Sequence, residues 1–254
     1  AVALHTRAGK PRNARCRVGR ARNRLFGSSH LRKSSFDGSH STGASKFEEP
    51  YRMPGYLPAA LGMKRNMDAT YIIGIDLGTT NCVLAYAPVS EESAEIQLLD
   101  IPQLVAAGTV EARPSLPSFL YLAPAHETAG GALDLPWATG QTFAVGEYAR
   151  RQGAEVPDRT VVAAKSWLCH SRVDRRRPIL PWGAPDEVPK VSPVTATQRY
   201  LEHLVGAWHH ANPDAPLAEQ HVVLTVPASF DAAARELTRE AALAAGLPED
   251  FVLL

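Results

Sequence analysis

The pattern of apolar and polar positions divides the chain into a segment without periodicity and a segment in which strand and helix patterns follow one another. Residues 1–66 keep neither the two-residue period of a strand nor the 3.6-residue period of a helix. Their few bulky apolar side chains cannot offset an ordering cost of about 1–2 kcal/mol per residue. We therefore predict a disordered N-terminal extension at 1–66 and a folded region at 67–254.

The first half of the folded region is expected to be mostly sheet. An apolar run at 71–76 is followed by turn-forming residues at 78–81 and by a second apolar run at 82–87. This order predicts a strand, a tight turn and a returning antiparallel strand. Further strands are predicted at 97–101, 115–122 and 142–145.

Helical patterns follow in the middle of the chain. A short helix is predicted at 146–152, and a second helix from Asp158, as its N-cap, to Leu168. Residues 169–191 contain several prolines and glycines and are expected to form a loop. A longer helix is then predicted from the N-cap Ser192 to about Asn212, because apolar residues recur at helical spacing.

The C-terminal part alternates strand and helix. The continuous apolar run at 221–226 is typical of a strand buried in a mostly parallel sheet. Asp231 is expected to cap a helix that Gly246 ends, and 251–254 begin another strand. A strand–helix–strand order implies a parallel crossover, whereas the hairpin at 71–87 implies antiparallel pairing. The prediction is a mixed α/β layer.

Composition and charge narrow the class of protein. With 254 residues, 45% hydrophobic and 21% charged, the chain can bury the core of one large or two small domains. These values exclude a disulfide miniprotein, collagen and a wholly disordered chain. No apolar run reaches the roughly 18 residues that a spanning helix needs, so we expect a soluble protein without a membrane partner.

The net charge of +1 conceals two segments of opposite balance. Residues 1–66 hold 14 basic and 3 acidic side chains, whereas 67–254 hold 13 basic and 23 acidic ones, which supports a boundary near Met67. The basic extension has the composition of a transit peptide, a nucleic-acid arm or a membrane-surface patch, but no amphipathic or aromatic pattern supports any of these. We favour an artefact or an extension without function, and do not expect nucleic-acid binding.

Cysteine usage indicates the redox compartment. Cys16, Cys82 and Cys169 are odd in number and widely spaced, and they form no Cys-x-x-Cys pair. Neither a disulfide framework nor a zinc site is suggested, and we expect a reducing, cytoplasmic location.

The predicted turn after the first strand contains the most promising chemistry. Asp76 ends that strand, and Gly78, Thr79, Thr80 and Asn81 lead into the next. Such a turn can direct backbone N–H groups and hydroxyls at phosphate oxygens, while the carboxylate holds hydrated Mg²⁺. An ordinary hairpin turn commonly has the same residue types, so the turn by itself favours that interpretation over a phosphate site.

Two stretches resemble one known family. The run 73–81, Ile-Gly-Ile-Asp-Leu-Gly-Thr-Thr-Asn, resembles the first phosphate loop of the 70-kilodalton heat-shock protein family, the DnaK-like chaperones. The run 222–231, Val-Val-Leu-Thr-Val-Pro-Ala-Ser-Phe-Asp, with Ala245-Gly246-Leu247 beyond it, is similar to a strand, turn and helix of that family. The resemblance covers about 70–254 and is weaker between about 88 and 192. It implies the first lobe of an actin-like, ribonuclease H-like nucleotide domain, with a mixed sheet flanked by helices.

The resemblance also implies roles for single residues. Asp76 would hold Mg²⁺ through water, and the loop Gly78 to Asn81 would bind ATP or ADP, with Thr79 and Thr80 at the β- and γ-phosphates. Lys165 resembles the family's catalytic lysine, beside the γ-phosphate and the attacking water, where its charge would act in phosphoryl transfer. By its helical pattern alone, however, Lys165 is expected on a solvated face.

Two more residues resemble a coupling device. Pro227 and Arg235 look like the family's switch pair, which transmits the nucleotide state to the substrate-binding part. By pattern alone, Pro227 is a strand terminator and Arg235 a surface charge in the first helical turn. His209-His210 and three tryptophans, Trp167, Trp182 and Trp208, are expected to pack rather than to bind a metal or a base.

The function implied is ATP binding in a molecular chaperone that acts on unfolded client polypeptides with co-chaperones. The family's second phosphate loop, Asp-Leu-Gly-Gly-Gly-Thr, is not in this sequence. We therefore expect this chain to be part of a longer ATPase, and to bind ATP weakly without turning it over. A sugar kinase and a filament protein of the actin-like superfamily remain alternatives, and the run at 222–247 favours the chaperone.

Overall fold

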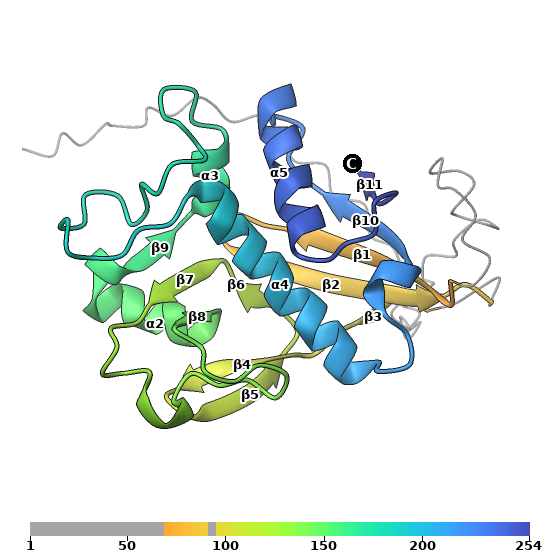
Figure 1. Cartoon of the computed structure of the whole chain (residues 1–254). Coiled ribbons are helices and arrows are strands. Elements are labelled where there is room, and N and C mark those ends of the chain that lie inside the picture. The colour runs from red at the N-terminus through yellow and green to blue at the C-terminus, as the bar shows by residue number, and fades with distance from the viewer. Residues whose placement is uncertain (1–68, 91–94) are drawn as a thin grey trace, which may run out of the picture. The chain divides into compact units, whose positions relative to one another are not determined.

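The computed structural model describes residues 69–90 and 95–254, and these form a mixed α/β arrangement (Figure 1). The predicted disorder at 1–66 and the boundary near Met67 lie outside the described residues and stay predictions. None of the helices in these ranges is long and apolar enough to cross a membrane.

A mixed sheet runs through the described region in the order β11-β10-β1-β2-β3, with β6 also paired to β2. Strands β1 and β2 form the predicted antiparallel hairpin, and β10 lies parallel to β1 and to β11. The prediction of a mixed α/β layer is thus confirmed. The bounds of these strands are β1 Tyr71–Leu77, β2 Asn81–Pro88, β3 Gln97–Leu98, β6 Leu116–Pro117, β10 His221–Thr225 and β11 Val252–Leu253.

Two helices lie across one face of this sheet (Figure 1). Helix α4 (Pro193–Ala211) begins as predicted, because the Ser192 hydroxyl accepts a hydrogen bond from the Thr195 amide at 2.9 Å. Its apolar stripe is buried and includes Trp208, which packs edge-to-face on two tyrosines of the β1–β2 hairpin. Burial of this stripe attaches the helix to the sheet.

Helix α5 (Ala232–Ala244) also has the predicted ends. The Asp231 carboxylate accepts from the Ala234 amide at 2.6 Å, and Gly246 follows the helix with a φ of +96°. The loop predicted at 169–191 contains no helix or strand.

The remaining strands form two smaller sheets. Strands β4 and β5 make a hairpin, and β7 pairs with both β8 and β9. Helix α2 packs against β7 and β4. The bounds are β4 Ile101–Ala106, β5 Thr109–Arg113, β7 Phe119–Leu122, β8 Phe143–Val145, β9 Thr160–Val162 and α2 Glu147–Glu155, with single 3-10 turns at η1 Ala129–Gly131, η2 Pro157–Arg159 and η3 Leu217–Glu219.

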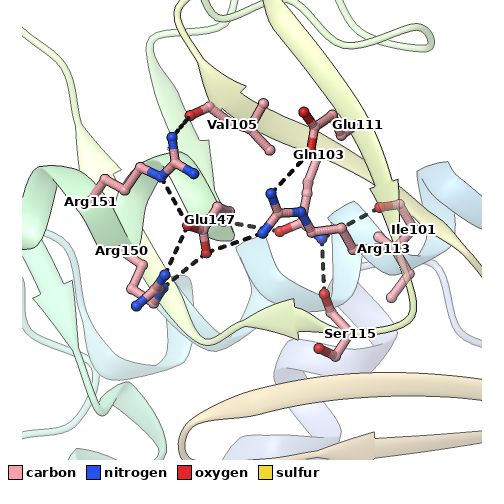
Figure 2. Close-up of polar contacts among 9 residues, drawn as sticks. All are labelled: Ile101, Gln103, Val105, Glu111, Arg113, Ser115, Glu147, Arg150 and Arg151. Atoms are coloured by element: carbon pink, nitrogen blue, oxygen red, sulfur yellow. Dashed lines mark hydrogen bonds and ion pairs between the residues drawn. The ribbon is translucent and has the colours of Figure 1, made fainter.

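The hairpin β4–β5 was not predicted, since only its first residue falls in the expected strand at 97–101. Pro102 and the fully buried Gln103 interrupt the apolar pattern of β4, and β5 is exposed along most of its length. Gln103 is satisfied by bonds to distant backbone: its Nε2 donates to Ser115 O at 2.9 Å, and its Oε1 accepts from the Glu147 amide at 3.0 Å (Figure 2). A buried glutamine of this kind leaves no periodic signal.

The helix predicted from Asp158 to Leu168 is wrong. Residues 157–159 form the turn η2, 160–162 form β9, and only Ala164–Leu168 are helical, as α3. The β-branched run in β9 pairs antiparallel with β7, so a long-range sheet contact overrides the local helical spacing. Ala163, between β9 and α3, has a φ of +54°, a left-handed conformation that an alanine rarely adopts.

The three tryptophans expected to pack differ in exposure. Trp208 is fully buried, as predicted, whereas Trp182 is 64% exposed and packs only on another aromatic ring. Its ring stacks on Trp167 at a centroid distance of 4.9 Å, and Trp167 stacks on His170 in turn. Because Trp182 lies on the loop 169–191, no helix or strand covers it.

Candidate functional site

The turn between β1 and β2 requires glycine at its first position. A Cβ atom added to Gly78 would lie 1.9 Å from the carbonyl oxygen of Asn81, a distance that no side chain can occupy. Thr79, Thr80 and Asn81 follow it and are exposed. The turn is therefore tight, and it presents two hydroxyls and an amide to solvent.

Asp76 lies at the carboxyl end of β1, beside the end of the parallel strand β10. The sheet register pairs it with Thr225, whose hydroxyl donates to Asp76 Oδ1 at 2.9 Å. Asp76 itself is exposed. One carboxylate oxygen is thus oriented by the neighbouring strand, and the side chain still faces solvent.

Lys165 is buried, with an exposed fraction of 6%, so the general expectation of a solvated lysine does not hold. Its Nζ donates to the carbonyl oxygen of Leu77, the residue before Gly78. Burial lowers the pKa of Lys165, and the charge of Asp76 opposes that change. The ammonium group therefore lies under the start of the turn, close enough to Asp76 for their charges to interact.

The turn after β10 also lies close to Lys165. Lys165 Nζ lies 5.7 Å from the centre of the Phe230 ring, in the turn that follows β10. The structure thus brings together Asp76, Lys165 and the 226–230 turn, which are far apart in the sequence. Carboxyl ends of adjacent parallel strands meet at one edge of a sheet, and that is where ligands bind in many α/β proteins.

Pro227 and Arg235 flank the same region but bond to different partners. The carbonyl oxygen of Pro227 accepts from the Phe230 amide at 3.0 Å, which closes the turn after β10. Arg235 Nη2 donates to the carbonyl oxygen of Leu253 at 2.7 Å, at the end of β11. Arg235 therefore links α5 to the edge of the sheet, and its coupling role with Pro227 stays a prediction.

Metal binding here would depend on few protein ligands. Within 69–90 and 95–254, no group of three His, Cys, Asp or Glu side chains could hold a metal ion. Mg²⁺ commonly keeps several waters and uses one or two carboxylates together with substrate phosphates. Asp76 with the adjacent hydroxyls fits that arrangement, whereas a fully protein-held metal centre does not.

Sequence reasoning missed three residues of this region: Thr225, Phe230 and Ser118. Thr225 could have been found, because it ends a strand predicted to be parallel to the strand of Asp76. Phe230 lies in the run 222–231 that resembles the family, but the resemblance implies no role for it. Ser118 lies 40 positions after Gly78 and bonds to it, and no local pattern indicates such a contact.

The chain matches no protein-family model, and a search of curated proteins found no match either.

Proposed function

We propose that this chain is the nucleotide-binding part of an ATP-dependent molecular chaperone of the heat-shock type, with an actin-like fold. One observation carries the proposal: an exposed turn with Asp76, Thr79 and Thr80 lies directly over a buried lysine, Lys165, at the carboxyl edge of a mixed sheet. This combination of carboxylate, hydroxyls and cation has the chemistry that a magnesium–triphosphate group requires.

Each residue would make a different contact with the magnesium–triphosphate group. Asp76, oriented by Thr225, would hold the hydrated Mg²⁺, and the hydroxyls of Thr79 and Thr80 would donate to phosphate oxygens. Lys165 would supply positive charge from below the turn, where its low exposure weakens screening by water. Bound Mg²⁺ would neutralise phosphate charge. Gly78 would keep the backbone close enough to contact the ligand.

The chaperone class is supported by the segment from β10 to α5. Its strand, Pro227 turn and capped helix have the predicted lengths, and Arg235 links the helix to β11. A change at the nucleotide edge could reach the rest of the protein along this path. Through it the protein would act on unfolded polypeptides, together with co-chaperones, in the cytoplasm.

Isothermal titration of the purified chain with ATP, with and without Mg²⁺, tests the nucleotide site. We expect magnesium-dependent binding that Asp76→Asn weakens at least about tenfold, because the cation loses the carboxylate proposed to hold it. Asp100→Asn, which alters another exposed carboxylate, should bind as the unchanged chain does. Absence of binding at millimolar ATP by the folded chain would contradict the proposal.

A second titration separates the chaperone from other ATP-binding classes. Added hexoses should leave the affinity for ATP unchanged. In a sedimentation assay, ATP should not cause the chain to pellet as a polymer. A carbohydrate-dependent increase in affinity would indicate a sugar kinase, and pelleting with ATP would indicate a filament protein.

A further inference from the structure

Ser118 is a buried residue that makes two hydrogen bonds to the β1–β2 turn. It lies between β6 and β7 and is 1% exposed. Its backbone amide donates to the carbonyl oxygen of Thr80 at 2.8 Å, and its hydroxyl donates to the carbonyl oxygen of Gly78, also at 2.8 Å. One residue thus binds two carbonyl groups of the turn.

These two bonds determine the direction of two amide groups. In a trans peptide unit, the C=O and the following N–H point in opposite directions. Because the carbonyls of Gly78 and Thr80 point at Ser118, the N–H groups of Thr79 and Asn81 point away from it, and both of these residues are exposed. Backbone N–H groups that are free of partners within a turn can bind an anion.

Cys82 supports the serine from behind. Its Sγ lies 3.4 Å from Ser118 Oγ. Burial raises the pKa of Cys82 to about 11, so the thiol keeps its proton. Since the Ser118 hydroxyl proton is directed at Gly78, the thiol is the donor to Ser118 Oγ. Cys82 and Ser118 therefore form a chain of two hydrogen bonds that ends at the Gly78 carbonyl oxygen in the turn.

We propose that Ser118 is a positioning residue for phosphate binding: it keeps the turn in the conformation that presents the amides of Thr79 and Asn81 to the ligand. The inference rests on the proposed nucleotide site. It adds that the affinity of that site for phosphate depends on a side chain that does not touch the ligand.

The test compares Ser118→Ala with the unchanged chain by titration with Mg²⁺–ATP and with Mg²⁺–tripolyphosphate. Loss of the hydroxyl leaves the Gly78 carbonyl without its donor, and we expect about tenfold weaker binding of both probes. The ratio of affinities with and without Mg²⁺ should stay unchanged, because Asp76 is not altered. Ser115→Ala is the matched control. Ser115 is a half-buried serine three residues before Ser118, and its loss should leave the affinities for Mg²⁺–ATP and Mg²⁺–tripolyphosphate unchanged.

Ser118→Cys provides a second variant should the alanine variant not fold. The thiol has nearly the size of the hydroxyl but is a weaker donor, so we expect an intermediate loss of affinity in a folded protein. Amide hydrogen exchange of Thr79 and Asn81 gives an independent readout, and exchange should change in this variant without any ligand.

The outcomes separate the two proposals. If the unchanged chain binds neither probe, the proposed nucleotide function is wrong, and the role of Ser118 falls with it. If the unchanged chain binds both probes and the folded Ser118 variants bind them equally well, only the positioning role is wrong. If the Ser118 variants instead lose the magnesium dependence, Ser118 acts through the cation rather than through the amides, and the inference is also overturned.

Discussion

Lys165 is a charged side chain in a position that normally excludes charge. Removing an ammonium group from water costs several kcal/mol unless the protein supplies compensating groups. The Leu77 carbonyl accepts from Nζ, and the charge of Asp76 stabilises the cation. Ala163, two residues earlier, adopts a strained left-handed conformation, and strained residues of this kind are concentrated at functional sites. The environment of Lys165 therefore favours a functional role over a purely structural one.

At the same scale, Gly78→Ala should disrupt the turn. The new Cβ would meet backbone at Asn81, which cannot move without breaking the β1–β2 hairpin. We expect a loss of roughly 1–3 kcal/mol in the free energy of unfolding, together with loss of ATP binding. Chemical denaturation and titration with Mg²⁺–ATP measure the two effects.

Gly74→Ala is the matched control for that substitution. Gly74 lies in β1, four residues before Gly78, but its added Cβ would come no closer than 4.0 Å to the Ala85 carbonyl oxygen. The free energy of unfolding and the nucleotide affinity of the Gly74→Ala variant should stay near those of the unchanged chain. Equal losses in the two variants would show that the turn is not specially restricted.

At the scale of elements, helix α2 is joined to its neighbours by a buried carboxylate (Figure 2). Glu147 is 4% exposed, and Arg150 binds both of its oxygens at 2.8 and 2.9 Å. Arg151 and Arg113 add contacts of 2.9 and 3.7 Å, the latter from strand β5. The cluster thus connects α2 to the β4–β5 hairpin, which has few apolar contacts on its β5 side.

Glu147→Gln should destabilise the protein in a pH-dependent way. The bonds from Arg150, partly offset by burial, lower the pKa of Glu147 from 4.5 to about 2. A carboxylate whose pKa is lowered by folding stabilises the protein at pH values above its ordinary pKa. This stabilisation is lost as the pH falls through the pKa of the folded state. We expect the variant to be about 2–3 kcal/mol less stable at pH 7. The difference should disappear between about pH 4.5 and pH 2.

Urea denaturation over that pH range measures the effect, and Glu155→Gln is the control. Glu155 is exposed on the same helix, so its replacement should change the stability little at any pH. A constant difference between Glu147→Gln and the unchanged chain from pH 7 to pH 2 would show that the carboxylate charge is not what holds the cluster.

Helix α5 depends on its N-cap more than on the ion pair that Asp231 makes. Asp231 binds the Ala234 amide at 2.6 Å and lies 3.4 Å from Arg175, and its side chain is 53% exposed. Asp231→Asn should keep the cap and lose only the ion pair, so its melting temperature should fall little. Asp231→Ala should lose both, so its melting temperature should fall further. Equal melting temperatures for the two variants would contradict the assignment of the cap.

At the scale of the whole described region, one hydrophobic cluster connects the mixed sheet to its two covering helices. It joins β1, β2 and β10 to α4 and to the end of α5, and it extends to β7, β8 and β9. Strand β10 is buried at four of its five positions, whereas β5 is almost entirely exposed. The candidate site therefore lies at the ends of buried central strands, whereas β5 is far more exposed.

Amide hydrogen exchange should follow this division. We expect the slowest exchange in β1 and β10, with protection roughly 3 kcal/mol or more above that of β5, because burial and central pairing oppose local opening. Mass spectrometry of peptides after deuterium labelling measures it. Uniform protection over β1, β10 and β5 would indicate that the β4–β5 hairpin unfolds only with the central sheet.

The sequence alone determined the elements that have their own local signals. Apolar alternation followed by a glycine turn predicted the β1–β2 hairpin, and a continuous apolar run predicted β10. Caps predicted the ends of α4 and α5, since a capping side chain and the amide that it binds lie within one helical turn. The carboxylate and hydroxyls of the candidate site were found for the same reason, because they stand together in one turn.

Tertiary structure decided the features that depend on distant partners. Residues 160–162 form a strand because they pair with the second edge of β7, and the β4–β5 hairpin is joined to α2 by the bond between Gln103 and the Glu147 amide. The burial of Lys165 and the bonds of Ser118 to the turn connect positions 88 and 40 residues apart. Local periodicity reports only on neighbours within a few residues, so contacts across the fold leave no trace in it.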